Sequence, residues 1–256
     1  MDFAYTLSGF AVGAIVGLTG VGGGSLMTPL LVLLFGVTPA TAVGTDLLYA
    51  AITKAGGVVV HGRSQHIRWD IVGRLAAGSL PGALVTIAVL ATVEIDSAAF
   101  SKLVTHSLGF ALILTAFAIL LKDRLQRWGR VADGAWRERW IAPLTVLTGF
   151  VLGMLVTLSS VGAGALGVAA LFFLYPRLAT VEIVGSDIAH AVPLTLLAGL
   201  GHAHLGTVDF ALLGSLLIGS LPGIALGSAL SARVPDTLLR SGLASILVVT
   251  GGKLVL

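Results

Sequence analysis

The sequence predicts an all-α polytopic membrane protein of two inverted-topology repeats. Each repeat has about five helical segments, with broken or re-entrant helices meeting near the midplane. Composition is the first observation behind this prediction, because 56% of the 256 residues are hydrophobic and only 11% are charged. About a quarter of the residues of a soluble domain are charged. Apolar runs long enough to cross a bilayer recur, for example at 71–91, 103–121 and 210–230. The alternating strands of a transmembrane barrel are not seen in the sequence.

An internal repeat is the second observation. The stretch LSGFAVGAIVGLTGVGGGSL at 7–26 aligns with LTGFVLGMLVTLSSVGAGAL at 147–166. After one inserted residue, VGTD at 43–46 aligns with VGSD at 184–187, and the pentapeptide GSLPG follows at the matching place in both halves. Agreement in register over so much of both halves exceeds what a shared apolar composition produces.

Each repeat divides into five apolar segments. In repeat one, residues 1–121, they are 4–21, 25–37, 43–60, 70–92 and 100–121. In repeat two, residues 141–256, they are 141–159, 164–175, 183–201, 209–230 and 238–256. The second segment of each repeat is short, since about 13 helical residues reach only about 20 Å of a hydrocarbon core about 30 Å thick. The first two segments are therefore predicted to form a hairpin that reverses inside the membrane.

The positions of Lys and Arg are the third observation. Residues 122–140 carry six of the 15 basic residues, which predicts a basic linker in the cytoplasm. The loop with Arg63 and Arg68 falls on the same side, whereas its counterpart at 202–209 has no Lys or Arg. This exchange predicts an inverted repeat with both termini outside the cytoplasmic membrane. Secondary transporters are often built in this way, with the substrate site at the midplane.

The two glycine-rich hairpin tips, at 22–25 and 162–165, are the predicted substrate site. Backbone groups at this depth must line protein or a wet cavity, and helix N-termini with close-lying glycine suit an anion. A kink that only allows close packing is the alternative. Thr28 and Ser159 are further hydroxyl donors. The predicted anion-binding residues are Gly22, Gly23, Gly24, Ser25, Thr45, Lys54, Ser160, Gly162, Ala163, Gly164 and Ser186.

Ionisable residues within the predicted spans are candidates for proton coupling, because such residues are costly in a membrane. Asp46 and Asp187 follow Thr45 and Ser186, which are expected to cap the third helix of each repeat. Capping and a proton or cation role are both open for the carboxylates. Lys54 either pairs with a carboxylate or faces the anion path. His190 lies one turn after Asp187 and can titrate near neutral pH.

Other function classes are disfavoured. The chain has no cysteine, which excludes disulfides, thiol catalysis and cysteine metal sites. His202 and His204 alone are weak evidence for metal, so no metal and no cofactor are predicted. The net charge of +3 is gathered in loops and does not indicate nucleic acid. No nucleotide-binding or hydrolase motif is present, and the N-terminus lacks the basic region of a signal peptide.

The chain resembles the sulfite exporter TauE/SafE family of membrane transporters. The resemblance rests on GAIVGLTGVGGGSLMTPLLVLLFGVTPATAVGTDLLY at 13–49, on the GSLPG pair and on the weaker second copy at 153–199. It implies export or exchange of a small sulfur-containing anion, such as sulfite, sulfoacetate or a related organosulfonate. An anion channel of the same architecture and an intramembrane enzyme using Asp187 and His190 are the alternatives. Glycine-rich helix faces suggest a homodimer.

Overall fold

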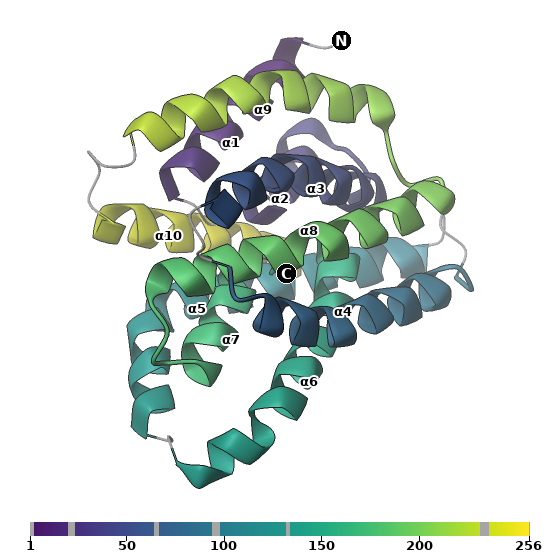
Figure 1. Ribbon diagram of the computed structural model, residues 1–256. Coiled ribbons are helices and arrows are strands. Elements are labelled where there is room, and N and C mark those ends of the chain that lie inside the picture. Colours follow the sequence, from purple (N-terminus) through teal and green to yellow (C-terminus); the bar gives the residue numbers. More distant parts are fainter. Residues whose placement is uncertain are drawn as a thin grey trace.

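The computed structural model describes residues 3–19, 24–63, 67–93, 98–131, 134–230 and 236–255. Within these ranges the chain forms ten helices and no strand. The helices are α1 (Phe3–Thr19), α2 (Gly24–Phe35), α3 (Pro39–Arg63), α4 (Trp69–Leu90), α5 (Ala98–Val131), α6 (Ala135–Ser159), α7 (Ala165–Leu174), α8 (Thr180–His204), α9 (Phe210–Leu230) and α10 (Asp236–Val255). In Figure 1, α1 and α9 lie at the top and α6 at the bottom, with α3 and α8 between them.

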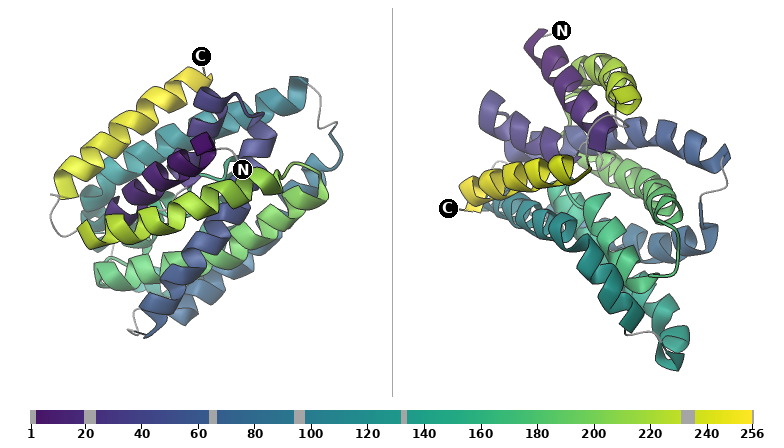
Figure 2. Two further views of the ribbon diagram at one scale, coloured as in Figure 1. Left: turned by 90° about the horizontal axis from the view of Figure 1, so that it is seen from above. Right: turned by 90° about the vertical axis from the view of Figure 1, so that its left-hand side faces the viewer.

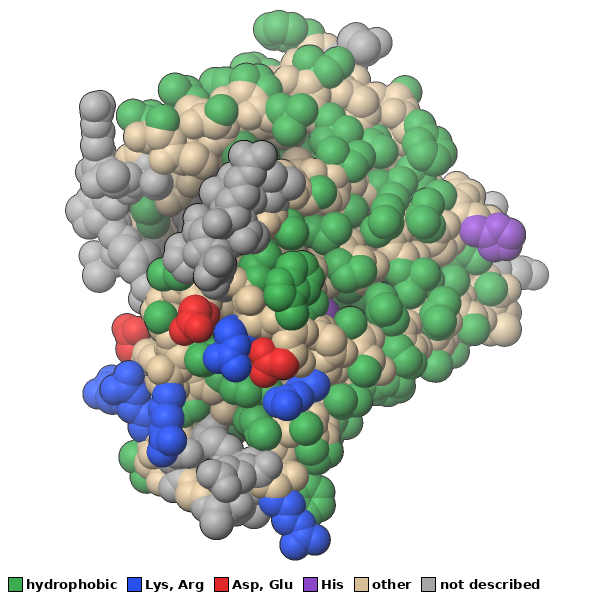
Figure 3. All heavy atoms as spheres, in the orientation of Figure 1, with side chains coloured by type: hydrophobic (Ala, Val, Ile, Leu, Met, Phe, Trp, Pro, Cys, Tyr) green, Lys and Arg blue, Asp and Glu red, His purple; other side chains and the backbone are tan. Residues whose placement is uncertain are grey.

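Five of the described helices are long and apolar enough to cross a bilayer. They are α4, α5, α6 from Arg139 onward, α8 and α9. Side chains exposed on these helices are largely hydrophobic, among them Phe110, Phe117 and Leu221. Figure 3 shows this apolar surface over the upper and right-hand parts of the molecule, while basic and acidic side chains gather on the lower part. The chain is therefore an all-helical membrane protein, as predicted.

The predicted segments correspond to helices, but several boundaries were wrong. The third helices begin at Pro39 and Thr180 rather than at 43 and 183. Thr38 precedes Pro39, and proline is favoured at the first position of a helix because it has no N–H to leave unpaired. The Thr38 hydroxyl accepts the N–H of Thr41 at 3.4 Å, as an N-cap does. At α8, the Glu182 carboxylate accepts the N–H of Ala179 at 3.0 Å.

Residues 122–140 are mostly helical rather than a loop. Helix α5 continues to Val131, ten residues beyond the predicted end, and α6 begins at Ala135. Lysine, arginine and glutamine are good helix formers, so this stretch can leave the apolar segment without ending the helix. The exposed arginines Arg124, Arg127 and Arg130 lie on this extension of α5.

Helices α1 and α9 pack backbone against backbone. Gly9 and Gly13 on α1 face the backbone of Leu216 and Ser220 on α9, in that order. Gly17 faces Ile224 one turn further along. Small residues at such a spacing let two membrane helices approach closely. Because both residue numbers rise together, α1 and α9 run in the same direction.

Helices α4 and α6 repeat this packing with the equivalent residues of the other copy. Gly149 and Gly153 on α6 face the backbone of Leu75 and Ser79 on α4. In the sequence alignment, Gly149 corresponds to Gly9 and Leu75 corresponds to Leu216. The first helix of each copy therefore packs against the fourth helix of the other copy.

The third helices of the two copies pack against each other at the centre of the molecule. Gly44 on α3 faces Thr207, just after the end of α8, whereas Gly199 on α8 faces Leu48 on α3. Rising numbers on one helix pair with falling numbers on the other, so α3 and α8 run in opposite directions. Figure 2 shows these two helices within the bundle from two further sides.

Candidate functional site

A cluster of four buried ionisable side chains lies where α3 and α8 meet. Asp46 and Lys54 come from α3, and Asp187 and His190 come from α8. Asp46 has no exposed surface, Lys54 is 9% exposed, and Asp187 and His190 are each 1% exposed. Eight residues, or about two turns, place Asp46 and Lys54 on one side of α3. We call these four residues the polar cluster.

The tip of the second hairpin lies beside this cluster. Helix α6 ends at Ser159, and Ser160 takes a left-handed conformation with φ 57° while its N–H donates to the Val156 carbonyl at 2.7 Å. Gly162 and Gly164 follow with φ of 111° and 146°. Only glycine adopts such angles readily. The glycines therefore reverse the chain, and α7 begins at Ala165.

Lys54 connects the first copy to the tip of the second. Its ammonium group donates a hydrogen bond to the backbone carbonyl of Ala163. The carboxylates of Asp187 and Asp46 act on Lys54 electrostatically, Asp187 more strongly. The sequence predicted Lys54, the second tip and the two aspartates as separate candidates for the site. The structure places all of them together.

Asp46 is held by hydrogen-bond donors. The Thr28 hydroxyl on α2 donates to Asp46 Oδ2 at 2.5 Å, and the Ser160 hydroxyl interacts with the same carboxylate. Asp46 Oδ1 and Ser160 Oγ are buried without a hydrogen-bond partner among the described residues. Thr28 therefore donates the hydrogen bond to Asp46, and Ser160 is a near neighbour. Asp46 therefore lies between α2 and the second tip.

Asp187 has a different environment, although it is the equivalent of Asp46 in the second copy. Its carboxylate lies against Gly167 in the first turn of α7. Neither Asp187 oxygen has a hydrogen-bond partner in the described part of the chain. One turn later, His190 Nε2 makes a 2.8 Å hydrogen bond with the Ser79 hydroxyl on α4, and His190 Nδ1 has no partner there.

Thr45 and Ser186 hold connections between helices instead of starting a helix. The expectation that they cap their own helices was wrong, because both lie two turns inside α3 and α8. Thr45 Oγ1 accepts the N–H of Asp209 at 3.0 Å, and Ser186 Oγ accepts the N–H of Arg68 at 2.9 Å. Asp209 and Arg68 occupy equivalent places before α9 and α4. Each hydroxyl thus fixes the start of a helix from the other copy.

Part of the first tip lies outside the described residues. Gly22 and Gly23 belong to that part, whereas Gly24 and Ser25 form the first two positions of α2.

His202 is buried, with its ring nitrogens bonded to the Thr157 carbonyl at 2.9 Å and to the Thr207 hydroxyl at 2.8 Å.

Two residues of the site were missed from sequence. Ser79 contacts His190, and Gly167 contacts Asp187. The repeated GSLPG motif could have indicated Ser79, because Ser79 and Ser220 are the serines of its two copies. Ser220 lies beside Tyr49, the equivalent of His190. Gly167 had no such signal, because its counterpart in the alignment is Met27.

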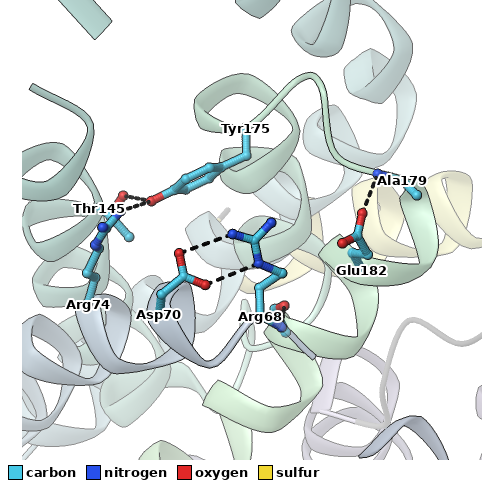
Figure 4. A network of polar contacts seen from close by, with 8 residues as sticks. Arg68, Asp70, Arg74, Thr145, Tyr175, Ala179 and Glu182 are labelled. Carbon is cyan, nitrogen blue, oxygen red and sulfur yellow. Dashed lines mark hydrogen bonds and ion pairs between the residues drawn. The ribbon is translucent and has the colours of Figure 1, made fainter. Parts of the chain in front are cut away.

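A second polar network surrounds the start of α4 (Figure 4). Arg68 Nε and Asp70 Oδ1 form an exposed ion pair at 3.2 Å. Arg74 Nη1 donates to the Tyr175 hydroxyl at 3.3 Å, and that hydroxyl also bonds Thr145 Oγ1 at 2.8 Å. These contacts join α4, α6 and the connection between α7 and α8. They fix the end of the bundle that carries the exposed arginines.

Curated relatives of this chain are named as membrane transporters. "Probable membrane transporter protein YjnA" of Bacillus subtilis (strain 168) is 41% identical, with 100% of each chain covered. "Probable membrane transporter protein YdhB" of the same strain is 28% identical over 84% of each chain. "Probable membrane transporter protein MJ0441" of Methanocaldococcus jannaschii is 30% identical over 75% of this chain and 68% of its own. No solved structure matches the chain.

The family comparison covers almost the whole molecule. The sulfite exporter TauE/SafE family matches residues 5–254, which include both hairpins and all four residues of the polar cluster. This confirms the resemblance drawn from the glycine-rich motifs and the GSLPG pair. The chain is a membrane transporter that belongs to the sulfite exporter TauE/SafE family.

Proposed function

We propose that this protein is a secondary active transporter that exports or exchanges a small sulfur-containing anion, such as sulfite, sulfoacetate or a related organosulfonate. The anion is held between Lys54 and the hairpin tips. The hydrogen bond from Lys54 to the Ala163 carbonyl carries this proposal, because it brings a buried cation to a glycine-rich tip that begins a half-helix.

The chemistry of this contact favours an anionic substrate. An ammonium group has three N–H donors, and the Ala163 carbonyl takes one of them. The remaining donors and the N-terminus of α7 both favour negative charge. A tip that served only for packing would not need a buried lysine, which is expensive inside a membrane.

The arrangement of the helices supports an inverted repeat. Equivalent pairs of helices make equivalent contacts, as in α1 with α9 and α6 with α4. The equivalent helices α3 and α8 run in opposite directions. A two-fold axis that exchanges antiparallel helices would lie across them, and such an axis would turn one copy upside down relative to the other. Two such copies could open the central site to either side of the membrane in turn.

Transport by purified protein in liposomes tests the proposal. Vesicles loaded with unlabelled sulfite, sulfoacetate or sulfate receive the same labelled anion outside, with and without a pH gradient. With the membrane potential held at zero, a carrier accumulates label transiently by exchange, whereas a channel only equilibrates it. Vesicles with the Lys54→Met/Asp46→Asn double variant, in which the uncompensated charge is also removed, are the control for the site. Absence of exchange for all three anions by well-folded protein would contradict the proposed function, and flux without exchange would indicate a channel.

A further inference from the structure

We propose that Asp187 is the proton-binding group of this transporter and that Asp46 stays ionised. This inference rests on the proposed function and deepens it, since it assigns different roles to two aspartates that the repeat makes equivalent. Their surroundings in the polar cluster carry the distinction.

The surroundings of Asp46 favour its ionised form. The Thr28 hydroxyl donates to it at 2.5 Å, and Ser160 and Lys54 lie nearby. Hydrogen bonds to a carboxylate and a nearby cation both favour the ionised form. An ionised Asp46 in turn compensates the buried ammonium group of Lys54.

Asp187 lacks such donors. It is 1% exposed, both carboxylate oxygens are without a hydrogen-bond partner among the described residues, and the carboxylate lies against Gly167 on α7. A buried carboxylate without hydrogen bonds is more stable when it holds a proton. Lys54 is the charged group that acts on it, and Asp187 shares this lysine with Asp46.

The other titratable group near Asp187 does not replace it as a proton site. His190 lies one turn further along α8, and its Nε2 is engaged by Ser79 of α4. His190 is itself 1% exposed, so a proton there would add a second buried cation to the cluster that holds Lys54. Asp187 is thus the carboxylate of the cluster to which no described residue donates a hydrogen bond.

The charge of the cluster then couples proton to anion. With both carboxylates ionised, two negative charges surround one ammonium and the cluster repels an anion. When Asp187 takes a proton from water, Lys54 and Asp46 cancel and an anion can enter. Loss of the proton from Asp187 on the far side restores the negative charge and drives the anion out. Proton and anion therefore bind cooperatively and travel in the same direction.

Infrared spectroscopy of purified, substrate-free protein tests the proton site independently of any substrate. At neutral pH we expect a protonated carboxyl C=O band in the wild type. This band should disappear in Asp187→Asn and persist in Asp70→Asn, which changes an exposed carboxylate. A band that persists in Asp187→Asn, or is absent from the wild type, would overturn the proposal.

Transport tests the coupling. Sulfoacetate is a suitable probe because its charge does not change near neutral pH. Its efflux from wild-type vesicles should rise with lumenal acidity, by up to about tenfold per pH unit. Folded Asp187→Asn protein should still exchange sulfoacetate but at a rate independent of pH. Retained pH dependence, or complete loss of exchange, would overturn the role of Asp187. Failure of the wild type to move any anion would instead refute the proposed function, and the infrared result would stand on its own.

Discussion

Lys54 is the residue on which both the site and its stability depend. It is buried, bonds the Ala163 carbonyl and faces two carboxylates. Removing one partner of a buried ion pair leaves the other charge uncompensated, at a cost of about 3–5 kcal/mol. The residue therefore has a structural and a functional role, and a single substitution cannot separate the two.

A double substitution can separate them. We expect Lys54→Met to lower the thermal stability in detergent and to abolish sulfite binding. Adding Asp46→Asn should restore most of the stability, because it removes the uncompensated charge, but should not restore binding. Thermal unfolding and calorimetric titration of the two variants measure these effects. Rescue of stability by Asp187→Asn in place of Asp46→Asn would contradict the assignment of Asp46 as the ionised carboxylate.

The glycines of the second tip give a prediction about backbone conformation. Gly162 has φ 111°, and Gly206, between α8 and α9, has φ 75°. An added Cβ at either site is disfavoured by about 1–2 kcal/mol. We expect Gly162→Ala and Gly206→Ala to lower stability by similar amounts, but only Gly162→Ala to slow anion exchange. Equal transport by the two variants would show that the tip geometry is not required for function.

At the scale of helices, close packing by glycine holds the two copies together. Gly149 faces the Leu75 backbone, and its counterpart Gly9 faces the Leu216 backbone. A valine side chain at either position must push two helices apart. Overpacking of this kind costs about 1–3 kcal/mol and occasionally more.

We therefore expect Gly149→Val and Gly9→Val to reduce the yield of monodisperse protein to a similar extent. Matched controls are Gly73→Val on α4 and Gly214→Val on α9, which are also repeat equivalents and have open space around an added Cβ. Size-exclusion chromatography in detergent compares the four variants. Normal yields for Gly149→Val and Gly9→Val would show that these helix pairs tolerate separation.

Much of the fold could be predicted from sequence because lipid imposes long apolar helices. The first and last residues of the helices were harder to predict. Pro39 looked like a loop residue but begins a helix, and the charged residues 122–131 looked like a linker but extend α5. Local composition predicts which segments lie in the hydrocarbon core. It predicts less well the residue at which a helix ends, because a helix can continue beyond the apolar segment.

The sequence predicted most residues of the site but not which of them contact one another. Lys54 and Ala163 lie 109 residues apart, and no local pattern indicates that they meet. The bond from Thr45 to Asp209 is likewise made between the two copies. Such contacts depend on how the first helix of one copy packs on the fourth helix of the other, and this arrangement appears only in three dimensions.

For the whole molecule, the inverted arrangement can be tested by labelling. The chain has no cysteine, so single cysteines introduced at exposed sites can be modified with a membrane-impermeant thiol reagent. We expect His204→Cys to react in intact cells, and Arg68→Cys and Arg130→Cys to react only after permeabilisation. Reaction of positions 68 and 204 from the same side would contradict the inverted repeat.

The pairing of helices between copies also affects how the protein is made. Helix α1 meets its partner α9 only after roughly 190 further residues have been added, which takes on the order of 10–40 s at usual rates of synthesis. During that interval the glycine face of α1 is without its native partner in the membrane. The first half of the chain therefore cannot complete its own packing, and biogenesis of this transporter depends on keeping early helices available until the last ones arrive.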